Sequence, residues 1–154
     1  MKKELNVGFI TTLSGRWPRE LPQKRRDEYG RWLDETFPGI NIVKADGLVD
    51  SQPVVDETIE RFKRESVDVL VMLYGAFTGD DIPSAFAEEL HVPVILWAPY
   101  EPPFARDDRL YANALVAVTM NAASLKRLGH TSHVVYGSKE DVPVQSRVKS
   151  LIRA

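Results

Sequence analysis

Aromatic, hydroxyl and guanidinium side chains gather in three short segments, and each segment directly follows an apolar stretch of the sequence. Aromatic faces stack on the CH surfaces of sugars, while guanidinium and hydroxyl groups form hydrogen bonds with sugar oxygens. The residue types therefore predict a binding site for a small polyhydroxylated ligand. A second interpretation stays open for both tryptophans, which is that they only pack the loops onto the fold. The segments carry Ser14, Arg16 and Trp17; Tyr74, Phe77 and Thr78; and Trp97, Tyr100 and Glu101.

Motifs that hold nucleotide phosphates do not occur in this sequence. Residues 12–15 resemble a phosphate-binding turn only superficially, because neither GxGxxG nor GxxxxGK[ST] is present and Trp17-Pro18 would crowd a pyrophosphate. FMN is favoured less than a sugar, since the same segment lacks the run of Ser and Thr donors that surrounds a phosphate. We therefore expect no cofactor in this chain.

Other titratable residues have ordinary structural interpretations. The three histidines lie at a helix end or beside strands and lack the i, i+4 spacing and the neighbouring carboxylates of a metal site, so we favour a role as polar residues at helix ends. The acidic pairs at 80–81 and 107–108 are interpreted as helix caps, and the basic run 24–26 as a solvated helix face. The sequence therefore predicts neither a metal site nor a catalytic residue. The histidines are His91, His130 and His133.

Alternating strands and helices must position the three polar segments. Five β-then-α units predict one doubly wound, flavodoxin-like α/β domain over residues 1–154, with three layers and a five-stranded parallel sheet ordered 2-1-3-4-5. In such a sheet, ligands bind beyond the carboxyl ends of the strands, where the three segments meet. Strands are predicted over 5–12, 40–45, 67–74, 92–97 and 132–136. Helices are predicted from 22 to 37, from 51 to 66, from 80 to 90, from 112 to 128 and from 141 to 154.

Composition excludes several classes of partner. The net charge of -2 in 154 residues gives no basic surface for nucleic acid. No apolar run approaches the roughly 20 residues that a membrane helix needs, so we expect no membrane partner. The absence of cysteine removes any dependence on disulfides and favours a cytoplasmic protein.

Three stretches of the chain resemble a known family. They are Val7-Gly8-Phe9-Ile10-Thr11-Thr12, then Val92-Pro93-Val94-Ile95-Leu96-Trp97-Ala98, and a tail in which His133-Val134-Val135-Tyr136-Gly137 is followed by Asp141, Val144-Gln145 and Leu151. In order and motif, they are similar to the amino-terminal domain of the L-fucose isomerase and L-arabinose isomerase superfamily. The resemblance covers essentially the whole chain, and it implies the first domain of a longer protein.

The resemblance also implies a function and partners. Members of this family are metal-dependent ketol isomerases, and later domains hold the divalent metal, usually Mn²⁺, and perform the proton transfer. This domain would then contact the sugar and pack between subunits of a homo-oligomer, without catalysing alone. Family positions that contact the sugar match Arg16 and Trp97. Near Asn113 the arabinose-isomerase pattern has a His that this chain lacks, which favours a fucose-isomerase-like relative.

Two other classes stay open. The opening strand and residues 13–15 are also similar to the first half of periplasmic-type sugar-binding domains, which would make the chain a stand-alone sugar-binding or sensor module. A flavodoxin-like electron carrier is the third interpretation. For the isomerase interpretation we expect Arg16 and Trp97 to share one cleft and both to be partly exposed, and we expect apolar surface that promotes self-association.

Overall fold

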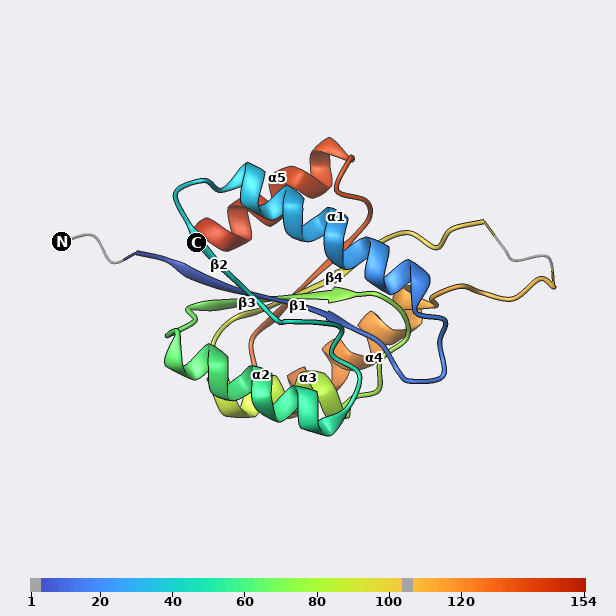
Figure 1. The fold of residues 1–154 in the computed structure, drawn as a ribbon, viewed down its shortest axis with the longest axis horizontal. Helices are drawn as coiled ribbons and strands as arrows, with labels where there is room; N and C mark the ends of the chain where they lie inside the picture. The colour runs from blue at the N-terminus through green and yellow to red at the C-terminus, as the bar shows by residue number, and fades with distance from the viewer. Residues whose placement is uncertain (1–3, 104–106) are drawn as a thin grey trace.

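Five parallel strands form the central sheet in the order β2-β1-β3-β4-β5, which confirms the predicted topology (Figure 1). The computed structural model describes residues 4–103 and 107–154. The strands are β1 (Asn6–Thr12), β2 (Asn41–Lys44), β3 (Val69–Tyr74), β4 (Val94–Ala98) and β5 (Ser132–Tyr136). The helices are α1 (Glu20–Thr36), α2 (Gln52–Arg64), α3 (Asp81–Leu90), α4 (Ala114–Arg127) and α5 (Val142–Arg153).

Helices cover both faces of the sheet, with α1 and α5 on one side and α2, α3 and α4 on the other (Figure 1). The continuous apolar run of β3 follows from this arrangement, because all six of its residues are buried between the two helical layers. Its side chains alternate between the two cores. Leu70 and Met72 pack toward α2 and α3, while Val71 and Leu73 pack toward α1 and α5.

Apolar spacing and turn residues set the helix boundaries close to the predicted ones. α2 has Ser51 as its N-cap and a proline in its first turn, where the missing N–H is tolerated. α3 ends at Leu90, and its C-cap residue His91 adopts a left-handed conformation with φ of 53°. That position agrees with a helix-end role for this histidine.

The carboxyl ends of β1, β3 and β4 lie at one edge of the sheet, as parallel pairing requires. β4 continues to Ala98, one residue beyond the predicted end. Residues 99–103 and 107–113, the described parts of the segment between β4 and α4, project beyond this edge, away from the two helical layers (Figure 1). The loops that follow β1, β3 and β4 therefore lie at the same end of the molecule, although they are far apart in the sequence.

Candidate functional site

A groove of about 930 Å³ lies between the loops that follow β1, β3 and β4. This volume is in the range of small-molecule sites. Of the predicted residues, Ser14, Arg16, Trp17 and Phe77 line the groove together. The remaining lining residues are Pro18, Asp107, Arg109, Leu110 and Tyr111. The structure therefore brings the predicted first segment to a candidate ligand site at the carboxyl edge.

Main-chain hydrogen bonds fix the walls of the groove to one another. The Ser14 N–H donates to the Phe77 carbonyl at 2.6 Å, and the Phe77 N–H donates to the Ala112 carbonyl at 2.6 Å. The Gly75 N–H donates to the Thr12 carbonyl at 2.9 Å, which anchors the same loop to the end of β1. We call these three contacts the loop ladder. Because the ladder uses backbone atoms, it holds the three loops side by side without relying on side-chain hydrogen bonds.

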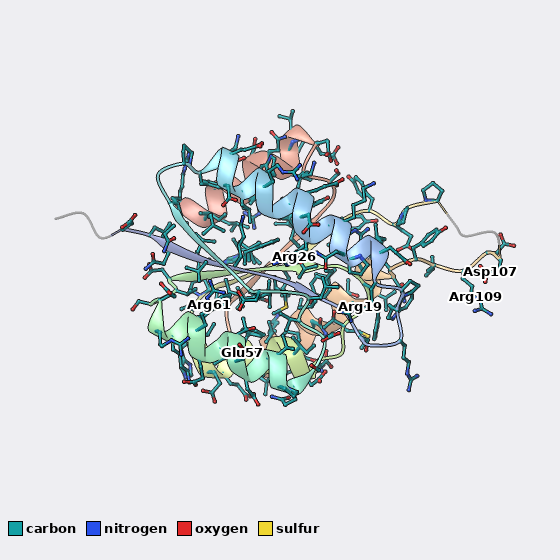
Figure 2. All side chains as sticks on the ribbon, viewed as in Figure 1. Arg19, Arg26, Glu57, Arg61, Asp107 and Arg109 are labelled. Carbon is teal, nitrogen blue, oxygen red and sulfur yellow. The ribbon has the colours of Figure 1, made fainter. Side chains whose placement is uncertain are left out.

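Aromatic rings and an unpaired guanidinium provide the binding chemistry of the groove. The rings of Trp17 and Phe77 are stacked, with centroids 6.5 Å apart and an interplanar angle of 30°. Arg16 is exposed and has no hydrogen-bond or ion-pair partner within residues 4–103 and 107–154. Arg109 is paired with Asp107, since its Nε lies 3.1 Å from Oδ2, and Figure 2 shows both on the projecting segment. The groove thus offers stacking surfaces and one free cation.

Trp97 is not part of this groove, and the prediction that it is partly exposed is wrong. Its side chain has no accessible surface. The ring faces the layer of α1 and α5, where Tyr29 and Trp32 contact it edge-on with centroids 5.0 and 5.5 Å away. The indole N–H donates to the Gly137 carbonyl at 2.9 Å. The reason is strand geometry, because side chains alternate between the two faces of a strand. Trp97 is still inside β4, so it faces one core while the residues before and after it, Leu96 and Ala98, face the other. Packing is therefore the role that the structure supports for Trp97.

Tyr100 also lies outside the groove, although it is at the same edge of the sheet. Its ring is 48% exposed and meets Tyr136 edge-on, with centroids 5.0 Å apart. A hydrogen bond with the Asp141 carboxylate raises the pKa of Tyr100. Tyr100 thus belongs to the loops near β5 rather than to the groove.

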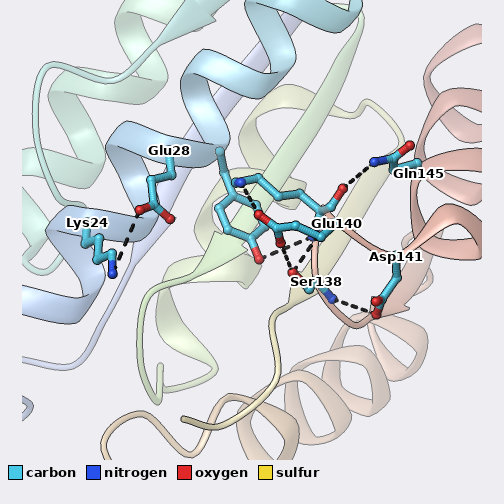
Figure 3. A network of polar contacts seen from close by, with 8 residues as sticks. Lys24, Glu28, Ser138, Glu140, Asp141 and Gln145 are labelled. Atoms are coloured by element: carbon cyan, nitrogen blue, oxygen red, sulfur yellow. Dashed lines mark hydrogen bonds and ion pairs between the residues drawn. The ribbon is translucent and has the colours of Figure 1, made fainter.

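The loop between β5 and α5 is tied to α1 by a separate polar network (Figure 3). The Lys139 N–H contacts the Tyr29 hydroxyl at 3.5 Å, and Gln145 donates to the Lys139 carbonyl at 2.7 Å. The Ser138 N–H contacts the Asp141 carboxylate at 3.4 Å. This network holds in place the residues that follow Gly137, whose carbonyl accepts the Trp97 hydrogen bond. It therefore supports the packing around Trp97 rather than the groove.

The basic run 24–26 is not wholly solvated, which corrects the sequence interpretation. Arg25 is 5% exposed, and its Nη1 donates to the carbonyls of Tyr74 and Gly75 at 3.2 and 2.9 Å. Its Nη2 donates to the Tyr100 carbonyl at 2.8 Å. Burial lowers the pKa of Arg25 below its ordinary value, and the nearby Tyr29 and Glu101 oppose this shift without cancelling it. The prediction from helical spacing is wrong for Arg25 because its guanidinium turns inward and donates hydrogen bonds to carbonyls at the end of β3 and after β4.

A second buried network crosses from the sheet to α4. The Tyr74 hydroxyl donates to Asn121 Oδ1 at 2.6 Å, and Asn121 Nδ2 donates to Asp80 Oδ1 at 2.8 Å. Burial raises the pKa of Tyr74. Asp80 is the N-cap residue of α3, as predicted, but its side chain bonds Asn121 and makes no cap hydrogen bond. Asp107 and Asp108 precede no helix directly, so their interpretation as caps is wrong.

Sequence reasoning missed the wall formed by residues 107 and 109–111. Leu110 and Tyr111 are 39% and 38% exposed, and an apolar pair at the end of a proline-rich loop is the signal that could have found them. Within the described ranges, no three His, Asp or Glu side chains are grouped to hold a metal ion. No helix in those same ranges is long and apolar enough to cross a membrane.

The strand order and the helical layers define the chain as a flavodoxin-like α/β domain. A family model described as the N-terminal domain of fucose/sulfoquinovose isomerase matches residues 8–134. The chain belongs to that family, which confirms the resemblance inferred from its motifs. A comparison with curated proteins found no match.

Proposed function

We propose that this chain is the substrate-contacting and subunit-packing domain of an aldose–ketose isomerase-like protein, and that it does not catalyse the reaction alone. The observation that carries the proposal is the groove at the carboxyl edge, where Arg16 is unpaired and Trp17 stacks with Phe77. Membership of an isomerase N-terminal family supports a sugar as the ligand. Stacking would hold the CH face of the sugar, and Arg16 would bond its oxygens or an anionic substituent.

In this proposal the groove binds and orients the sugar, but its side chains offer little acid or base chemistry for proton transfer. Ketol isomerisation moves a proton between adjacent carbons and needs a positioned acid and base. The carboxylate that lines the groove, Asp107, is exposed and already paired with Arg109. We therefore propose that the proton-transfer groups and a divalent metal, expected to be Mn²⁺, belong to a longer parent protein. Sugar contact through this edge would then complete a site formed by other domains.

The distribution of apolar surface supports the packing role. In the part of the chain that the structure describes, every large hydrophobic residue with high exposure falls between residues 100 and 142. α4 contains no charged residue from Ala114 to Leu125, and Leu115, Val116 and Met120 on its outer side are 40–46% exposed. A helix with apolar residues on both sides is usually covered on both sides. We propose that neighbouring domains or subunits cover this face.

Sugar binding to the isolated chain tests the proposal. L-fucose and sulfoquinovose are titrated separately while the Trp17 indole N–H is followed by NMR. Binding through one edge should be weak, with a dissociation constant of about 1 mM or higher. Arg16→Ala should weaken it further, whereas Arg19→Ala is the matched control, because Arg19 pairs with Asp50 outside the groove.

Two results would contradict the proposal. One is that neither sugar shifts the Trp17 signal, or that Arg16→Ala and Arg19→Ala have equal effects. The other is sugar interconversion by the purified chain with added Mn²⁺, which would show that the domain is catalytic by itself.

A further inference from the structure

One carboxylate closes the base of the segment between β4 and α4. Glu101 Oε1 accepts hydrogen bonds from the backbone N–H groups of Tyr111 and Ala112 at 2.5 and 3.0 Å. Its Oε2 accepts from the N–H of Asn113 at 2.8 Å. A single side chain thus satisfies three consecutive backbone donors that lie ten to twelve residues further along the chain. Hydrogen bonds to an ionised carboxylate are stronger than neutral ones, so this contact fixes the position of residues 111–113.

The middle one of these residues, Ala112, is the outer end of the loop ladder. The Ala112 carbonyl accepts the hydrogen bond from Phe77, and the Phe77 carbonyl accepts the one from Ser14. Tyr111 lines the groove directly. Asn113 has a left-handed conformation with φ of 54°, where α4 begins. Any displacement of residues 111–113 therefore moves one wall of the groove relative to Ser14 and Phe77.

Glu101 is itself anchored from the opposite side. The carbonyl of the preceding residue, Tyr100, accepts a hydrogen bond from Arg25. The same guanidinium also donates to the carbonyls of Tyr74 and Gly75. A path of hydrogen bonds consequently runs from α1, through the ends of β3 and β4, to the start of α4. Glu101 is the link in this path that reaches the groove wall.

We propose that Glu101 is a positioning residue for the groove: through its three backbone contacts it fixes the Tyr111 wall in the arrangement that binds the ligand. This inference rests on the proposed function, because it assumes that the groove binds a sugar. Glu101 does not line the groove, so its effect is exerted through residues 111–113.

Glu101→Gln tests the inference, because the amide keeps one acceptor oxygen and places a donor group against a backbone donor. Amide exchange of Tyr111, Ala112 and Asn113 should become about tenfold faster or more. The matched control is Asp108→Asn, which makes the same chemical change on the same segment. Asp108 has φ of 58°, a conformation that asparagine tolerates, and it does not line the groove.

The sugar titration of Trp17 is repeated on both variants, with the exchange of β3 amides as the measure of folding. Glu101→Gln should weaken sugar binding about tenfold, as measured by the Trp17 titration, while the exchange of β3 amides stays unchanged. Asp108→Asn should leave both sugar binding and amide exchange unchanged. Unchanged exchange at 111–113 would overturn the inference, and so would faster exchange with unchanged sugar binding. If no sugar perturbs Trp17 in the unsubstituted chain, the proposed function fails, whereas the exchange measurement still decides whether Glu101 holds the wall.

Discussion

Replacing Trp97 with phenylalanine should destabilise the domain by about 3 kcal/mol. The substitution removes the indole N–H that donates to the Gly137 carbonyl at 2.9 Å, and the buried carbonyl left without a partner costs about 1–3 kcal/mol. The smaller ring also weakens the edge contacts with Tyr29 and Trp32, each of which contributes about 0.5–1.5 kcal/mol. For a chain of 154 residues, the sum corresponds to a fall in Tm of about 6–12 °C.

Thermal and urea unfolding, followed by circular dichroism, measure this effect. Trp17→Phe is the matched control, because Trp17 lies on the groove loop and its loss should cost less than about 1 kcal/mol. The reasoning would be refuted if both variants lowered Tm equally, because a buried, hydrogen-bonded indole would then contribute no more than one in a loop.

Arg25→Met should lower the free energy of unfolding by about 2 kcal/mol in urea unfolding, because three carbonyl groups lose their donor; no loss would show that relief of the buried charge cancels that cost. Burial raises the pKa of Tyr74 above its ordinary 10.0, so the unfolded chain loses this proton first and stability falls as pH rises above about 10. Tyr74→Phe should make that fall shallower above about pH 10, and an unchanged slope there would contradict the assignment. Met120→Lys on α4 should reduce self-association in sedimentation, whereas Val142→Lys, a 70% exposed valine on the opposite layer, should not; equal effects would contradict the assignment of α4 as the packing face.

The fold could be predicted because its signals are local. The apolar run that became β3 is long enough for a strand covered on both sides, and each strand is followed by a helix with its own start and stop residues. Right-handed crossovers then leave few possible strand orders. Errors were confined to boundaries, such as α1 beginning at Glu20 before the predicted Pro22.

Side-chain environments could be predicted only in part. Ser14, Arg16 and Trp17 came together in the groove because they are close in sequence on one loop. Trp97 was misplaced, since a strand covered on both faces is apolar throughout and its sequence does not show where it ends.

Long-range partners explain the remaining failures. Arg25 was misread because its carbonyl acceptors are 49 to 75 residues away, and charge alone predicted solvent. Glu101 was predicted to lie with the ligand-binding side chains, but it binds three backbone donors instead, and these follow a loop whose path the sequence does not define. Every residue other than proline carries the same backbone donor and acceptor, so hydrogen bonds to the backbone leave no residue-type pattern in the segment that the side chain binds.

The loop ladder separates the shape of the groove from its chemistry. Ser14 and Phe77 are held by their main-chain atoms, so exchanging the side chains at these two positions changes polarity and size without removing the bonds that align the loops. Libraries that vary residues 14, 16, 17 and 77 should therefore yield folded domains with altered ligand preference more often than libraries that vary residues 25 or 101. This edge of the molecule is accordingly well suited to engineering recognition of new small ligands.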